Sequence, residues 1–249
     1  MQAIHKIIQK QHGNALFLIL IAVALFAALS YAITQSGRGG GNVTREINML
    51  NASEILQYAS TIKQATDKLL LINNCQLTEL SFQADWNGDG TDSGGNSADQ
   101  ANTTTPSDGR CRYFHENGAG LSFISKPSFL EDTDFMRGYR LHGNLGVDGL
   151  GEQFEPELIF GFRLHPTAAN LEICNAINRT LDLPENLSDT HNAQFFSYFS
   201  WGGTFGDATP HPSRVGDTAT ALSEAYTGCY NAVGYDGGGY IFYHVLAVR

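Results

Sequence analysis

The most pronounced feature of the hydrophobic pattern is an unbroken apolar run near the start of the chain. Residues 15–33 read ALFLILIAVALFAALSYAI, and no Asp, Glu, Lys or Arg occurs between Lys10 and Arg38. At a rise of about 1.5 Å per residue, such a run makes a helix of about 28 Å, close to the hydrocarbon thickness of a bilayer. We therefore expect a transmembrane helix over residues 14–35.

The charges that flank this run set its expected orientation. Lys6 and Lys10 precede it, and the next basic residue is Arg38. Positive charge on one side is typical of a helix whose N-terminus stays in the cytoplasm. The pattern predicts a single-pass protein of the inner or cytoplasmic membrane, with its N-terminus inside and the rest of the chain outside.

Beyond the run the pattern predicts a hinge and then an amphipathic helix. Residues 36–42 read SGRGGGN, and glycine is about 1 kcal/mol worse than alanine in a helix, so this segment should interrupt it. Between residues 44 and 73 apolar residues recur at steps of three to five, which favours a helix that packs on its own domain. The expected apolar stripe is Ile47, Leu50, Ile55, Ala59, Ile62, Ala65, Leu69 and Ile72.

The second half of the chain alternates apolar runs with turn-rich segments. Residues 83–110 are polar and rich in glycine and asparagine, which predicts a loop. Residues 167–183 have helical spacing and end before Pro184. Strands are expected at residues 121–124, 158–162 and 240–248, and the last two should be central. The expected fold class is α+β: the transmembrane helix, the hinge, and an exported globular domain over residues 43–249, with a helix, an antiparallel sheet and disulfides.

The start of the apolar run carries a recognisable processing pattern. A short basic leader ends at Gly13, and Asn14, Ala15 and Leu16 lead at once into the run. This arrangement resembles the type IV prepilins and pseudopilins. The resemblance implies that the leader, residues 1–13, is removed after Gly13 while the helix is kept for assembly.

One position departs from the family pattern. Counted from Asn14, the fifth residue is Leu18, where pilins that build a filament shaft usually carry a glutamate. The pattern is more similar to the minor pilins and tip-type pseudopilins, which can lack it. The resemblance implies a structural subunit, not an enzyme, of a type IV pilus-like or pseudopilus system, at the tip or as initiator. Its partners would be other pilin-like subunits, the inner-membrane assembly machinery and the membrane itself through residues 15–33, and it would join a cell-surface filament after assembly.

Other interpretations of the run remain open. Ser30, Tyr31 and Ala32 form a small-x-small site, so a conventional signal peptide cleaved after Ala32 would release a soluble binding protein or enzyme. The run could also be an uncleaved anchor. A buried helix of a soluble protein is a weaker alternative, because such helices normally keep a polar stripe.

All four cysteines follow the run, and an even exported set favours two disulfides. Of the three possible connectivities we expect Cys75–Cys111 and Cys174–Cys229, because each closes the shorter loop. Each bond could contribute about 3 to 4 kcal/mol. A zinc site that uses Cys111 and His115 is the weaker alternative, because the chain has no C-x-x-C pair.

One motif points to a metal. Residues 85–90 fit D-x-[DN]-x-[DN]-G, the first half of an EF-hand-type calcium loop, in which alternate side chains converge on one ion. The candidate ligands are Asp85, Asn87, Asp89, Thr91 and Asp92. The twelfth position is Asn96 instead of a bidentate glutamate, so calcium would bind weakly. The alternative is a solvated acidic turn.

Net charge excludes one class of partner. The chain has 15 basic and 25 acidic residues, a formal charge of −10. A surface of that sign repels a phosphate backbone, so nucleic-acid binding by overall charge is not expected.

Overall fold

The described part of the chain divides into two compact units at Ile47, and each is considered by itself. The computed structural model describes residues 19–27, 30–31, 40–84, 102–123, 140–152, 155–189, 205, 214–233 and 239–249. In the first unit, residues 19–27 and 30–31 are helical, and helix α2 (Gly40–Leu71) begins. The second unit contains most of α2, the sheet and the remaining helices.

The sheet of the second unit has six strands in the order β3-β5-β6-β2-β1-β4. They are β1 (Arg140–Val147), β2 (Glu157–Leu164), β3 (Ser188–Asp189), β4 (Arg214–Val215), β5 (Thr227–Ala232) and β6 (Tyr240–Ala247). The four inner strands pair antiparallel, whereas β3 runs parallel to β5 and β4 parallel to β1. Helix α3 (Ala168–Thr180) follows β2, and short 3-10 helices lie at Leu77–Glu79 and Thr220–Leu222.

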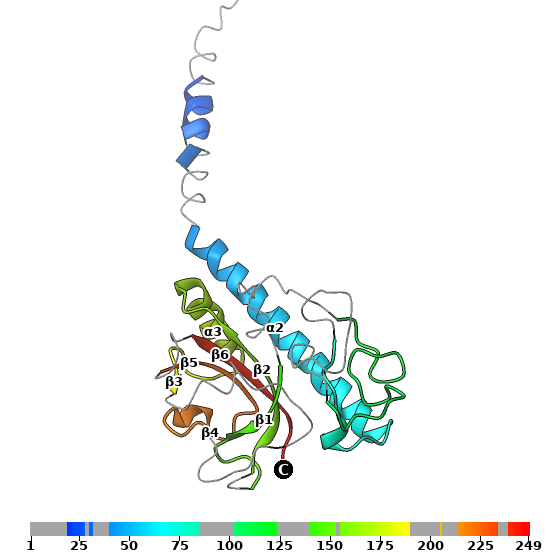
Figure 1. Ribbon diagram of the computed structural model, residues 1–249. Helices are drawn as coiled ribbons and strands as arrows, with labels where there is room; N and C mark the ends of the chain where they lie inside the picture. Colours follow the sequence, from blue (N-terminus) through cyan, green and yellow to red (C-terminus); the bar gives the residue numbers. More distant parts are fainter. Residues whose placement is uncertain are drawn as a thin grey trace, which may run out of the picture. The chain divides into compact units, whose positions relative to one another are not determined.

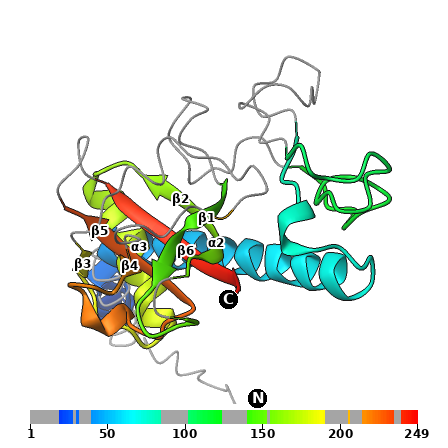
Figure 2. The same ribbon diagram turned by 60° about the horizontal axis from the view of Figure 1, so that its bottom comes forward.

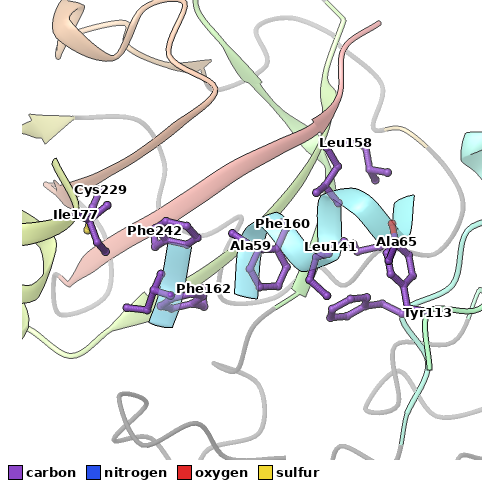
Figure 3. Close-up of a cluster of buried hydrophobic side chains, with 14 of the residues drawn as sticks. Ala59, Ala65, Tyr113, Leu141, Leu158, Phe160, Phe162, Ile177, Cys229 and Phe242 are labelled. Atoms are coloured by element: carbon purple, nitrogen blue, oxygen red, sulfur yellow. The ribbon is translucent and has the colours of Figure 1, made fainter. Parts of the chain in front are cut away.

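One face of the sheet packs against α2 and α3. Alternate residues of a strand point to one face, and Phe160 and Phe162 of β2 and Phe242 of β6 share a buried cluster with α2. Figure 1 and Figure 2 show α2 and α3 lying along the sheet, and Figure 3 shows Ala59 of α2 beside these aromatic rings. From α2 this cluster takes Ala52, Ile55, Ala59, Ile62, Ala65 and Leu69.

The opposite face of the sheet builds a second buried cluster. Ile241, Tyr243 and Val245 of β6 alternate with the residues that face α2, and they pack with Tyr230 of β5 and Leu222. Two apolar faces explain why β2 and β6 are central, as their apolar sequences predicted. The remaining members of the cluster are Leu145, Val147, Leu150, Ile159, Val215, Ala219 and Ala232.

Two disulfides join distant parts of the chain, and both predicted pairs are confirmed. Cys174–Cys229 ties α3 to β5, and Cys75–Cys111 ties the segment after α2 to residues 102–123. Because Cys111 is committed to a disulfide, the alternative zinc site at Cys111 and His115 is excluded.

The predicted fold class is wrong in its membrane helix and in its sheet. Over the described residues, no helix combines the length and the apolar character needed to span a membrane. This finding also overturns the predicted single-pass localisation in the inner membrane; residues 14–18, 28–29 and 32–35 lie outside the described part. The sheet is mixed instead of antiparallel, because both edge strands pair in parallel.

Smaller expectations about single elements also need correction. The last residues of the predicted hinge, 40–42, belong to α2, while residues 36–39 lie outside the described part. Residues 121–123 are not a strand.

Candidate functional site

The first candidate site is a group of exposed apolar side chains on the helical residues 19–27 and 30–31. Seven large apolar residues there lie in solvent, and Phe26 is 73% exposed. They are Ile19, Leu20, Ile21, Val23, Leu25, Phe26 and Tyr31. Such a set is unusual on a protein that acts alone, because exposed apolar patches usually mark a contact with another molecule. We call these residues the apolar segment.

Helix α2 carries two apolar stripes instead of the single stripe that the sequence predicted. Ile55 is fully buried, but Leu50 is 69% exposed and Ile47 51% exposed. The step of five residues from Leu50 to Ile55 turns the helix by about 140°, which moves the pattern to another face. Ile72, at the other end of the predicted stripe, is also exposed.

The exposed stripe is defined by Val43, Ile47 and Leu50. Their spacing of four and three residues places them on one face of α2. Asn48, a polar residue, is buried and occupies the face that continues toward Ile55. The two stripes are therefore distinguished by the face of α2 on which they lie, and not by hydrophobicity alone.

The predicted processing site and the predicted calcium loop both lie outside the described residues. Gly13 and Asn14 precede the first described position, and Asp85, Asn87, Asp89, Thr91 and Asp92 fall in the gap at 85–101. The residues on either side of this gap meet at one side chain: the Ser81 hydroxyl accepts from the N–H of Gln83 at 3.3 Å and of Asn102 at 3.4 Å. Calcium binding remains a prediction.

The described residues offer no ready metal centre. Nowhere in the described ranges do three or more His, Cys, Asp or Glu side chains gather closely enough to hold a metal ion. Two histidines of the sheet are withdrawn from solvent to different degrees, His142 being buried and His244 half-buried. Burial, with the charge of Arg140, lowers the pKa of His142 to about 3; burial, with the charge of Lys63, lowers the pKa of His244 to about 4. The His244 ring bonds the Thr227 hydroxyl through Nδ1 at 2.5 Å.

A buried carboxylate and guanidinium, which sequence reasoning did not single out, lie beside β1. Glu157 is the first residue of β2 and Arg214 the first of β4. Burial raises the pKa of Glu157 to about 7, and the Val147 N–H and the charge of Arg214 offset only part of that effect. No sequence pattern indicates this pair, because its two members are 57 positions apart in a chain with many other charges.

In comparisons with known proteins, no family model, no curated protein and no solved structure matches the chain. A functional interpretation therefore depends on the residues of this chain and on the arrangement described above.

Proposed function

We propose that the chain is a structural subunit of a type IV pilus-like or pseudopilus filament system and assembles with other pilin-like subunits through its N-terminal apolar helical residues. The observation that carries this proposal is the exposure of the apolar segment together with that of the stripe Val43, Ile47 and Leu50. Burying apolar surface stabilises an association by about 25 cal/mol per Å², so contact with similar helices would remove this surface from water.

The organisation of the second unit agrees with this role. One side of α2 is fixed to the sheet by its buried stripe, and two disulfides hold the surrounding chain. Within the second unit, this packing leaves Leu50 on the exposed side of α2. Disulfides also favour folding in an oxidising compartment, where extracellular filaments are built.

The leader pattern gives a direct test of this proposal. We expect the mature chain to begin at Asn14, because the resemblance implies cleavage after Gly13 and retention of the apolar segment. Intact mass and N-terminal sequencing of the protein, isolated from the cells that produce it, measure this directly.

A start at Ile33 would contradict the proposal. Cleavage after Ala32 removes the entire apolar segment and leaves the alternative, an exported binding protein or enzyme. A substitution of Gly13 by a bulky residue serves as the control. It should block processing after position 13 and leave cleavage after Ala32 unaffected.

A further inference from the structure

One face of α2 stays exposed along the part of the helix that belongs to the second unit. Leu50, near the start of this part, is 69% exposed, and Ile72, just after the last helical residue, is 75% exposed. The Ile72 N–H donates to the Lys68 carbonyl at 2.9 Å, so Ile72 continues the helical hydrogen-bond pattern. The 22 residues from Leu50 to Ile72 make about six turns and about 33 Å of helix, so both side chains lie on one face. Figure 1 and Figure 2 show the C-terminal end of α2 extending beyond the strands.

The charges of this face are placed symmetrically about its midpoint, Thr61. Four charged residues occur in this part of the helix, and two of them, Lys63 and Asp67, form an ion pair with each other at 2.5 Å. The other two are Glu54 and Lys68, which are both exposed and stand seven positions before and seven positions after Thr61. The face therefore carries one charge of each sign, at equal distances from its midpoint.

The exposed apolar residues follow the same symmetry. Leu50 and Ile72 stand eleven positions before and eleven positions after Thr61. When the direction of the helix is reversed about Thr61, each apolar residue falls on an apolar residue and each charge on a charge of opposite sign. This face of α2 is thus complementary to itself.

The hydroxyl groups of this face already have hydrogen-bond partners within the helix. The Ser53 hydroxyl donates to the Met49 carbonyl at 2.8 Å, and the Thr61 hydroxyl donates to the Gln57 carbonyl at 2.9 Å. A polar group that keeps its partner loses little when water is removed from it. A second protein surface can therefore cover this face at a small cost in desolvation.

We propose that this face of α2 binds the same face of a second copy of the chain, with the two helices antiparallel and Thr61 at the two-fold axis. Each Leu50 then contacts the partner's Ile72, and each Glu54 forms an ion pair with the partner's Lys68. A surface that is its own complement suits a two-fold symmetric contact, in which both copies use the same patch.

Charge favours this arrangement over a parallel one. Parallel copies in register would place Glu54 against Glu54 and Lys68 against Lys68, and like charges in contact are destabilising. The antiparallel pair instead makes two contacts between opposite charges. Nζ of Lys68 also donates to the Ala119 carbonyl at 3.1 Å, but an ammonium group has three donors and keeps two for a carboxylate. One helix from each copy makes a small interface, so we expect a weak dimer whose population rises with concentration.

The dimer goes beyond the proposed function and does not depend on it. Leu50 belongs to both surfaces, so the dimer and the larger assembly compete for this residue. Glu54 and Lys68 belong to neither the apolar segment nor the exposed stripe Val43, Ile47 and Leu50. Changes at these two charges therefore test the dimer separately from the larger assembly.

Charge reversal in the purified full chain tests the dimer. Sedimentation equilibrium is measured over a range of protein concentrations in a mild detergent, which covers the apolar segment and suppresses the larger assembly. The original chain should dimerise as its concentration rises, and Glu54→Lys or Lys68→Glu alone should weaken the dimer roughly tenfold or more. The double variant restores both contacts between opposite charges and should recover the original affinity. Glu172→Lys, at an exposed glutamate of α3, is the matched control and should leave the dimer unchanged.

Cysteine cross-linking tests the direction of the two helices. Under mild oxidation Thr61→Cys should give a disulfide-linked dimer, whereas Leu50→Cys should not, because antiparallel copies hold the two residues 50 about 33 Å apart. Efficient linkage through Leu50→Cys would mean a parallel pair and would overturn the proposal. So would an original chain that is monomeric at every concentration, or a double charge variant as weak as the single ones. None of these results would contradict the proposed function, which is tested by the processing site and by the larger assembly.

Discussion

Asn178 of α3 satisfies backbone groups that a neighbouring strand would otherwise bond. Its side chain is fully buried; Nδ2 donates to the Cys229 carbonyl at 2.7 Å, and Oδ1 accepts from the Cys229 N–H at 2.9 Å. A third bond runs from Nδ2 to the Pro184 carbonyl at 3.2 Å. The Asn178 amide thus bonds both backbone groups of Cys229 in β5, as the backbone of a neighbouring strand would. The disulfide Cys174–Cys229 joins the same helix, α3, to the same strand.

Replacing Asn178 with alanine should therefore destabilise the protein strongly. Asn178→Ala leaves the buried N–H and carbonyl of Cys229 without these bonds, and we expect a loss of about 3 kcal/mol in the free energy of unfolding. Urea denaturation of the purified chain measures it. Thr180→Ala on the same helix is the control, since Thr180 is exposed, its hydroxyl bonds the Ala176 carbonyl one turn earlier, and its loss should change little. A loss below about 1 kcal/mol for Asn178→Ala would contradict this role.

Glu157 should make the protein less stable as the pH rises. Its pKa is raised from 4.5 to about 7 in the folded chain, so between these values the folded state binds more protons than the unfolded state. Stability from this group is therefore greatest below about 4.5 and is lost as the pH rises through about 7. Glu157→Gln removes the charge, and at pH 8 it should raise the free energy of unfolding by up to about 3 kcal/mol.

Unfolding curves of both proteins, recorded about every half pH unit from pH 4 to pH 8, test this expectation. The difference between the variant and the original chain should shrink as the pH falls. His142 and His244 act in the opposite sense in both proteins: their lowered pKa values mean that stability falls as the pH drops below about 6.5. If the stability of Glu157→Gln relative to the original chain is lower at pH 8 than at pH 5, the raised pKa of Glu157 is wrong.

At the scale of elements, α2 shows what a pattern of apolar residues can and cannot predict. The spacing between residues 44 and 73 predicted a helix correctly, because local periodicity is a property of the sequence. It did not predict that Leu50 and Ile55 belong to different stripes, because that depends on which side the sheet approaches. The edge strands β3 and β4 were not predicted either, since two residues carry no periodic pattern.

The two stripes of α2 predict losses of very different size for the same kind of truncation. Ile55→Ala removes a fully buried side chain and should lower the free energy of unfolding by about 2 to 4 kcal/mol. Leu50→Ala removes an exposed one and should change it by less than about 0.5 kcal/mol. Chemical denaturation of both variants gives the comparison. Equal losses would mean that Leu50 is covered in the isolated protein.

At the scale of the whole molecule, sequence reasoning was most reliable for covalent links and least reliable for the role of the apolar run. The disulfides Cys75–Cys111 and Cys174–Cys229 followed from loop lengths and are confirmed. The transmembrane helix was inferred from hydropathy alone, and no described helix meets that requirement. Glu157 and Arg214 could not be found from the sequence, because only folding brings their strands to either side of β1.

In the proposed assembly, a neighbouring subunit would cover the exposed stripe of α2. We therefore expect the protein to occur in large assemblies, and to lose them when the exposed stripe is made polar while its fold is kept. The test variant is Ile47→Gln combined with Leu50→Gln, and the control is Val233→Gln, an exposed apolar residue outside both helices.

The most direct measurement is the sedimentation profile of the full chain after mild cross-linking in the cells that produce it. The original chain and the Val233→Gln control should sediment as large assemblies, while the double variant should shift to the monomer with an unchanged melting temperature. An original chain that sediments only as a monomer, or a double variant that assembles as well as the control, would contradict the proposed function.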